Sequence, residues 1–387
     1  MSKFLLIACE AGGGAWPPVA ALCEALVNEG HPVTVLCDES IKDSFTGADI
    51  CLLPDEVGMR PFFENAINTE IIPRLEAGDP FESLFNPIER WGDAVAPLVA
   101  EKVAAVKPDI VIGSIFGLPL ATNLARKLDV PLVGINPGAY VGPNPPRPPK
   151  DDYRDLNLFL FEHCILPPLF RSDMVLHATD QEFDLGFTAL PSTHHYVGPL
   201  IWSTSGTIPE EMTEPGLPWI TAAVSMVEQA GEIDLLQMIL DAADQLSARI
   251  LLTAPDHDYS ALAVPSNVKL MSFVSHSEAL KHSRLVLSHA GHGMVMRAIW
   301  MGIPMVLTPW DRDQHAVAYR ASRLGVAHAI DREELTADRL HTALAAALED
   351  SELYDNSTRE GERLRATNPG RLAVNLLTQF LSRSSSP

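Results

Sequence analysis

The chain has 387 residues and a mass of 42.1 kDa, enough for two domains that each bury a hydrophobic core. Its 28 Lys and Arg residues stand against 50 Asp and Glu residues, which gives a formal net charge of −22. An acidic chain of this kind repels phosphate backbones and anionic lipid, so we expect neither nucleic acid nor a membrane surface as a partner. With 47% hydrophobic and 20% charged residues, the composition is that of a folded globular protein.

The cysteines give no pairing framework. They are Cys9, Cys23, Cys37, Cys51 and Cys164. None forms a CxxC or CxxH pair, and although the first four are evenly spaced by 14 residues, they fall on different predicted elements. An odd number of unpaired cysteines is typical of a protein from a reducing cytoplasm.

The apolar runs predict neither an export signal nor a membrane span. The first run ends at Glu10 and is too short for the core of a signal peptide. The longest uncharged stretch, residues 110–125, contains Pro119 and polar residues and is shorter than a spanning helix. We therefore expect a cytoplasmic protein without membrane insertion.

Short aliphatic runs alternate with helical patterns through the first 200 residues. Strands are predicted at residues 3–9, 31–37, 48–53, 109–114, 131–137, 174–180 and 194–200, and helices at 18–29, 91–106 and 118–127. Pro17 and Pro18 fit the first turn of the first helix, and Gly30 fits its carboxyl-terminal cap. This alternation is typical of βαβ units in a parallel sheet.

A segment rich in Pro, Gly, Ser and Thr, residues 203–217, predicts a linker. After it, a second alternation predicts strands at 219–225, 249–254, 268–274, 285–288, 304–309 and 326–330, with helices at 233–246, 278–282, 294–301, 314–324 and 336–348. The last helix, 371–382, is expected to pack back on the first half. The predicted fold class is α/β, with two doubly wound, Rossmann-like domains at 1–202 and 218–370 facing each other across a cleft.

One strand-to-helix junction has the pattern of a phosphate site. A strand ends before His289, Gly291 and Gly293 follow, and a helix begins near Met294. Glycines permit a tight turn and close approach of a ligand, and the N–H groups at a helix N-terminus bind phosphate. Two interpretations stay open: a diphosphate site with His289 as a donor, or an ordinary turn that carries a histidine.

The next junction adds polar groups suited to sugar hydroxyls. Asp313 follows His289 by 24 residues and is followed by Gln314 at the start of another helix. One βαβ unit separates the two junctions, so both open on the same edge of the sheet. The alternative is that Asp313 serves as a helix N-cap.

The stretch that holds both junctions, LSHAGHGMVMRAIWMGIPMVLTPWDRDQHAVAYRASRLGVA, resembles the donor site of family 1 nucleotide-sugar glycosyltransferases of the GT-B fold. The likeness is closest to bacterial members that decorate macrolides, polyketides and other natural products. Gly30-His31, the YVGP at residues 196–199 and Phe273-Val274 agree as well. The resemblance covers nearly the whole chain and is specific in the second half and loose in the first.

The resemblance implies an acceptor-binding first domain, a donor-binding second domain and a UDP- or dTDP-sugar as donor. The residues that it implies for the diphosphate are Ser225, His289, Gly291, His292, Gly293 and Met294; for the base, Phe273 and Val274; and for the sugar, Asp313 and Gln314. It implies no metal ion and no cofactor, because the helix N-terminus and the histidine stabilise the departing diphosphate.

Several positions depart from the family pattern. Met294 stands where the family has Ser or Thr, and Val224 where it has Gly. In the first half, Ala15 occupies the place of the general-base histidine, and Ser114 that of the carboxylate that orients it. Asp109 lies near, but a Pro-Asp pair that opens a strand is expected to be structural.

A positioned general base contributes roughly 10²–10⁴-fold in rate, so its absence needs an explanation. The acceptor can be an acidic phenol or enol, or one of Glu10, Asp151, Asp152 and His163 can serve as the base. The third explanation is a catalytically silent partner protein of the same fold. A sugar-nucleotide epimerase also shares the fold, but no acid/base pair for it stands out.

We expect a small apolar acceptor, bound by the loop after Cys9, the Phe62-Phe63 region and residues 156–170. The apolar residues of this last stretch fit a hydrophobic core equally well. A homodimer is compatible with the sequence.

Overall fold

The computed structural model describes residues 1–10, 14–54, 57–141, 159–203, 206–224, 232–244, 246–254, 262–310 and 312–384. The chain divides into two compact units. The first takes the chain up to Trp202 and again from Thr367, and the second extends from Ser203 to Ala366. The segment 203–217 is therefore counted with the second unit.

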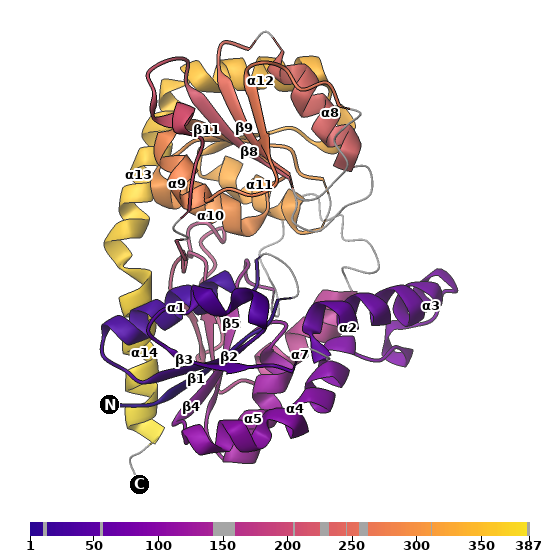
Figure 1. Ribbon diagram of the computed structural model, residues 1–387, viewed down its shortest axis with the longest axis vertical. Helices are drawn as coiled ribbons and strands as arrows, with labels where there is room; N and C mark the ends of the chain where they lie inside the picture. The colour runs from indigo at the N-terminus through magenta and orange to yellow at the C-terminus, as the bar shows by residue number, and fades with distance from the viewer. Residues whose placement is uncertain are drawn as a thin grey trace. The chain divides into compact units, whose positions relative to one another are not determined.

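The first unit is built on a seven-stranded parallel sheet in the order β3-β2-β1-β4-β5-β6-β7 (Figure 1). Its strands are β1 (Phe4–Ala8), β2 (Val33–Cys37), β3 (Asp49–Leu52), β4 (Ile110–Ser114), β5 (Leu132–Asn136), β6 (Met174–His177) and β7 (His194–Tyr196). Its helices are α1 (Pro17–Asn28), α2 (Met59–Ala66), α3 (Ile72–Glu76), α4 (Pro87–Val106), α5 (Leu118–Leu128), α7 (Leu166–Phe170) and α14 (Pro369–Ser384).

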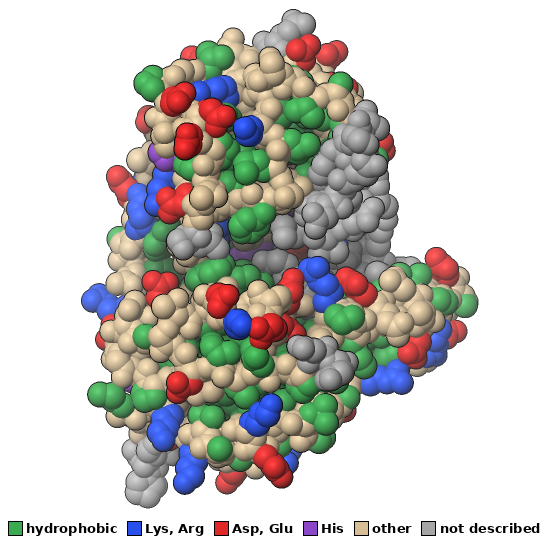
Figure 2. Space-filling view, viewed as in Figure 1, with side chains coloured by type: hydrophobic (Ala, Val, Ile, Leu, Met, Phe, Trp, Pro, Cys, Tyr) green, Lys and Arg blue, Asp and Glu red, His purple; other side chains and the backbone are tan. Residues whose placement is uncertain are grey.

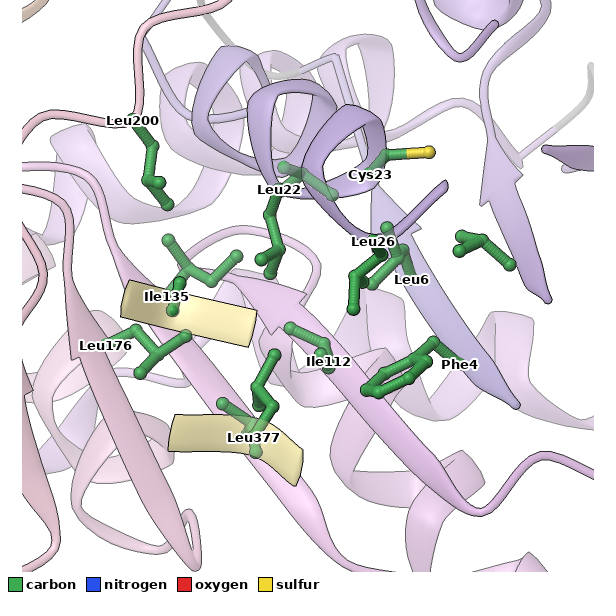
Figure 3. Packing of buried hydrophobic residues seen from close by; sticks show 14 of the residues in the cluster. Phe4, Leu6, Leu22, Cys23, Leu26, Ile112, Ile135, Leu176, Leu200 and Leu377 are labelled. Carbon is green, nitrogen blue, oxygen red and sulfur yellow. The ribbon is translucent and has the colours of Figure 1, made fainter. Parts of the chain in front are cut away.

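Helices cover both faces of this sheet, which is why its central strands β1, β4 and β5 are buried at every position and mostly apolar. On one face, α1 and α14 pack against side chains of β1, β4, β5 and β6 (Figure 3). Leu26 of α1 and Leu377 of α14 belong to this contact. On the other face, α4 and α5 bury Trp91 and Leu124 against alternate residues of the same strands. The α14 helix thus belongs to the core of the first unit.

The second unit has a six-stranded parallel sheet in the order β10-β9-β8-β11-β12-β13. Its strands are β8 (Trp219–Ala223), β9 (Arg249–Thr253), β10 (Val268–Met271), β11 (Ser283–Ser288), β12 (Met305–Leu307) and β13 (Ala327–Ala329). Its helices are α8 (Glu232–Ala243), α9 (His276–Ala279), α10 (His292–Met301), α11 (Gln314–Arg323), α12 (Ala337–Glu349) and α13 (Ser351–Thr367). Two Rossmann-like parallel sheets confirm the predicted fold class.

The strand order of each sheet reverses once. In the first sheet this switch point lies between β1 and β4, and in the second between β8 and β11. Loops that leave neighbouring strands at a switch point separate to opposite faces, so ligands bind there at the carboxyl ends of the strands. The predicted phosphate turn follows β11 and therefore lies at such a point.

The helix α13 is an element that the sequence pattern does not predict. Its buried positions are Leu353, Ser357, Gly361 and Leu364, a narrow stripe with only two large apolar residues. The glycine permits close packing, since a Cβ at Gly361 would lie 2.7 Å from the carbonyl oxygen of Ile299 on α10. A small-residue contact of this kind leaves little hydrophobic periodicity.

All five cysteines are free thiols, and four of them are buried. Burial raises the pKa of Cys23 and of Cys37 to about 12, so these thiols are inert. Within the described ranges, no helix is both long and apolar enough to cross a membrane. Acidic, basic and apolar side chains are interspersed on the face of the molecule in Figure 2.

Candidate functional site

His289 stands directly after β11, at the switch point of the second sheet. Its Nδ1 atom lies 3.2 Å from the carbonyl oxygen of Ala223, the last residue of the neighbouring strand β8. Burial lowers the pKa of the His289 imidazole to about 4, and the positive charge of Arg312 acts in the same direction. The ring is therefore held in place by β8 and is neutral at pH 7.

The turn between β11 and α10 brings the imidazole against the helix N-terminus. Gly291 is the N-cap residue, and a Cβ added there would lie 2.8 Å from Nε2 of His289. Glycine at this position therefore makes room for the ring. Gly293, in the first turn of the helix, is exposed and has open space around it.

The first turn of α10 offers fewer amide donors than expected. The N–H of Met294 donates to the carbonyl oxygen of Gly291 at 3.1 Å, which corrects the expectation that this amide is available to a phosphate. The N–H group of Gly293, in the first turn, precedes the first intrahelical bond of an α-helix. This N–H group and the helix dipole make the N-terminus of α10, called its anion-binding end below, a candidate site for a phosphate.

The turn between β12 and α11 places Asp313 one strand further along the same edge of the sheet. Asp313 occupies the N-cap position of α11, yet its carboxylate accepts no capping hydrogen bond. Burial raises the pKa of this carboxyl, while the guanidinium groups of Arg312 and Arg320 oppose the rise. The N-cap interpretation of Asp313 thus accounts for its backbone position and not for its side chain.

Gln314 has a role within the turn itself. Its side chain is 2% exposed, and its Oε1 atom accepts a hydrogen bond from the backbone N–H of Trp310 at 2.8 Å. This bond closes the β12–α11 turn on which Asp313 lies. A contact between Gln314 and a sugar stays a prediction.

Both turns contain a non-glycine residue in the left-handed region. Ala290 has φ 66° and Arg312 has φ 61°. Such conformations cost roughly 1–3 kcal/mol and cluster at functional sites. No motif in the sequence gives a role to Arg312, although its charge acts on both His289 and Asp313. An arginine between two acidic residues at a helix start is the signal that would have drawn attention to it.

The two residues predicted to bind the nucleotide base, Phe273 and Val274, differ in exposure. Phe273, after β10, is 65% exposed, whereas Val274 is 3% exposed and packs with Trp219 and Leu251. Ser275 then caps α9 by accepting a hydrogen bond from the N–H of Glu278. The Phe273 ring is thus available to a ligand, and the Val274 side chain supports it from the core.

Two other expectations for this site, the role of Ser225 and the absence of a metal ion, stay predictions. Ser225 lies outside the described residues. Among the residues that the structure describes, no group of three or more His, Cys, Asp or Glu side chains could hold a metal ion. The described polar groups near the two turns include the imidazole of His289, the guanidinium of Arg312, the carboxylate of Asp313 and the N-terminus of α10.

At the switch point of the first sheet, Ala15 and Ser114 provide no acid/base pair among the residues that the structure describes. Ala15 is 4% exposed and precedes α1, and Ser114 ends β4 with 4% exposure. The Ser114 hydroxyl has no hydrogen-bond partner among the described residues. The helix α1 begins with Pro17 and Pro18, which have no N–H to donate.

The candidate substitute bases are placed as follows. The Glu10 carboxylate accepts a hydrogen bond from Ser40 Oγ at 2.8 Å and lies 3.5 Å from a guanidinium nitrogen of Arg60. The ring of His163 packs between Phe81 and Phe159, with centroids 5.3 and 5.8 Å away. Asp151 and Asp152 lie outside the described residues. A role as general base stays a prediction for all four.

The apolar segments predicted for the acceptor also differ. Phe63 packs edge to face on Phe116, the second residue after β4, with centroids 5.6 Å apart. In the described part of the 156–170 stretch, Phe159, Cys164 and Leu169 are buried in the core under α4 and α5. The core interpretation therefore holds for these three residues.

Known proteins are similar to this chain in sequence or in fold. Residues 237–376 match the model of the erythromycin biosynthesis protein CIII-like C-terminal domain. The demethyllactenocin mycarosyltransferase of Streptomyces fradiae is 24% identical over 94% of this chain and 84% of that protein. The calicheamicin glycosyltransferase CalG4 has a TM-score of 0.74 at 18% identity, with 100% of each chain covered. The spinosyn rhamnosyltransferase SpnG complexed with thymidine diphosphate has a TM-score of 0.68 at 17% identity, covering 97% of this chain and 100% of that one.

The two parallel sheets and these structural neighbours define the class: the chain has the GT-B glycosyltransferase fold. Within that class its second half is similar to a domain of an erythromycin biosynthesis protein and the chain is similar to a mycarosyltransferase, in agreement with the resemblance to antibiotic and macrolide glycosyltransferases.

Proposed function

We propose that this chain transfers a sugar from a UDP- or dTDP-sugar to a small apolar acceptor, with inversion at the sugar carbon and without a metal ion or cofactor. The observation that carries the proposal is the pair of turns after β11 and β12. They present the His289 ring, the N-terminus of α10 and the Asp313 carboxylate at one edge of a parallel sheet. A diphosphate linked to a sugar needs this combination of donors and acceptors.

The chemistry follows from what each group can do. As the acceptor oxygen attacks the sugar carbon, the bond to the diphosphate breaks and negative charge collects on the leaving phosphate. Amide groups at a helix N-terminus stabilise such charge without a metal ion. The Asp313 carboxylate accepts hydrogen bonds from sugar hydroxyls, which hold the sugar for attack. The exposed ring of Phe273 offers a surface on which a base stacks.

For the acceptor we propose an acidic hydroxyl, a phenol or an enol. Ala15 and Ser114 supply neither a base nor a carboxylate to orient one. A phenol has a pKa of about 10, so its oxygen ionises far more readily than that of an alcohol. The edge-to-face pair of Phe63 and Phe116 supports an aromatic or otherwise flat acceptor, because such rings pack well on aromatic side chains.

A second candidate function is a catalytically silent partner that stabilises another enzyme. Three observations favour it together: Ala15, Ser114 and Met294 each lack the side chain that the catalytic family carries. A silent partner would keep the fold and need not release diphosphate.

One experiment separates the two candidates. The purified chain is incubated with UDP-glucose or a dTDP-sugar, with and without a panel of phenols, and release of nucleoside diphosphate is measured. The proposal predicts release that depends on an acceptor and is lost in Asp313→Ala. Binding of the donor without release under any acceptor supports the silent partner.

A further inference from the structure

The Ala223 carbonyl decides which nitrogen of His289 carries a hydrogen. A carbonyl oxygen only accepts, so the Nδ1 atom at 3.2 Å from it must be the donor. A neutral imidazole has a single N–H. While the ring is neutral, its Nε2 atom is therefore an acceptor with a lone pair.

That bare Nε2 atom faces the anion-binding end of α10. The position that a Cβ of Gly291 would take lies 2.8 Å from Nε2, so this edge of the ring lies against the first residue of the helix N-terminus. A phosphate oxygen bound by the amides of α10 would meet a lone pair at this edge. Two acceptors repel, so a neutral ring opposes the ligand that the helix attracts.

The surroundings of the ring favour its neutral form, and a bound anion would change that balance. Arg312, from the β12–α11 turn, and burial together bring the pKa of His289 to about 4. The other titratable groups of the two turns are His292 and Asp313, together with Asp311, which lies outside the described residues. A bound diphosphate adds two negative charges next to the ring, which favours the protonated form.

We infer that the nucleotide-sugar binds here together with one proton, which His289 takes up on Nε2 so that the ring donates to Ala223 and to the diphosphate at once. This inference rests on the proposed function of the site. When the product leaves with its negative charge, the proton is released as well. The affinity for the nucleotide-sugar therefore depends on pH, because His289 must be protonated, while the bond to Ala223 of β8 keeps its ring in place.

The test uses a nucleotide-sugar, because a diphosphate esterified at both ends has no group of its own that ionises near neutral pH. Binding of UDP-glucose and dTDP-glucose to the full chain is measured by calorimetry at pH 6, 7 and 8, in buffers of different ionisation enthalpy. We expect uptake approaching one proton per bound ligand and about tenfold tighter binding for each pH unit lowered.

Two variants complete the test. In His289→Gln, the amide replaces the Nε2 donor without a proton, and we expect binding without uptake and without a pH dependence. His341→Gln is the matched control. His341 lies on α12, and its Nδ1 atom makes a similar hydrogen bond, of 2.9 Å, to the carbonyl oxygen of Ala242. The control is expected to take up the proton as the unmodified chain does.

The outcomes distinguish the inference from the proposed function. Binding with no proton uptake at pH 6 to 8, or uptake that persists in His289→Gln, overturns the inference and leaves the donor site in place. If neither nucleotide-sugar binds at any pH, both the inference and the proposed function are overturned. The measurement on the unmodified chain decides the first outcome even where His289→Gln does not fold.

Discussion

A buried pair of histidines should make the first unit sensitive to acid. His177, at the end of β6, is 2% exposed, and His194, at the start of β7, is 6% exposed. The side-chain amide of Asn136 lies 3.0 Å from His177 Nδ1 and donates to it, and His177 Nε2 lies 3.0 Å from His194 Nδ1. This chain of hydrogen bonds is satisfied when both rings are neutral. Burial lowers the pKa of His177 to about 3 and that of His194 to about 4.

The size of the stability loss follows from the difference in histidine pKa between the folded and the unfolded chain. An unfolded histidine has a pKa of about 6.5, so below that pH the unfolded chain binds protons that the folded chain does not. Stability is therefore complete above pH 6.5 and is lost as the pH falls. At pH 5 each histidine lowers the free energy of unfolding by roughly 2 kcal/mol, and the pair by roughly 4 kcal/mol, because a difference of one pKa unit corresponds to about 1.4 kcal/mol.

Hydrogen exchange of β5, β6 and β7 at pH 7 and pH 5 reports this loss for the first unit alone. The double variant His177→Gln and His194→Asn keeps hydrogen-bonding atoms in similar places and cannot take up a proton. We expect it to remove most of the pH dependence. His282→Gln, at an exposed position, serves as the control and should change nothing. An equally steep loss of protection in the double variant would refute the reasoning.

Three further predictions use neighbouring or matched positions. Gly291→Ala should destabilise the second unit by about 1–3 kcal/mol because the new Cβ meets the histidine ring at 2.8 Å, whereas Gly293→Ala, with open space, should leave it unchanged or up to about 1 kcal/mol more stable in urea unfolding. Phe273→Ala should weaken nucleoside diphosphate binding about tenfold and change stability by less than about 0.5 kcal/mol, while Val274→Ala should cost about 2 kcal/mol of stability in the same unfolding assay. Ala15→His should raise the rate on unactivated alcohols by about 10²-fold and leave acidic phenols nearly unchanged, and equal gains on both would contradict an acidic acceptor.

Elements with strong local patterns could be predicted from the sequence. The α1 helix has prolines in its first turn and ends before Gly30, whose φ of 81° is the conformation that closes a helix. The strands buried on both faces are continuous apolar runs between turns, and these are visible in the sequence. By contrast, α13 buries the small residues Ser357 and Gly361, and its close contact with α10 is at Gly361. Small residues do not produce the periodic pattern of large apolar residues from which a helix is predicted.

The site was predictable where its chemistry is local. The glycines after β11 and the carboxylate after β12 mark strand-to-helix turns, and turns on neighbouring strands open on one edge. The bond from His289 to Ala223 joins residues 66 apart, so nothing in the sequence near either residue indicates it. Arg312 does have a local signal, since it stands between two acidic residues at a helix start, but its effect on His289 joins two turns that lie far apart in the sequence.

Side-chain direction was the other limit. Phe273 and Val274 are adjacent, and only the strand and cap that flank them decide that one ring is exposed and the other side chain is buried. Gln314 follows Asp313 directly, yet its amide closes the turn. The sequence pattern places both residues of each pair near the site. It does not show which of the two side chains is available to a ligand and which one is used within the protein.

The most direct test of the proposed donor site compares two variants with free nucleoside diphosphate. His289→Ala removes a group placed at the diphosphate, whereas Asp313→Ala removes one placed at the sugar. Calorimetry with dTDP and UDP should show binding weakened at least tenfold in His289→Ala and unchanged in Asp313→Ala, while Asp313→Ala loses turnover of the nucleotide-sugar. Binding of both diphosphates to both variants as to the unmodified chain would contradict the account.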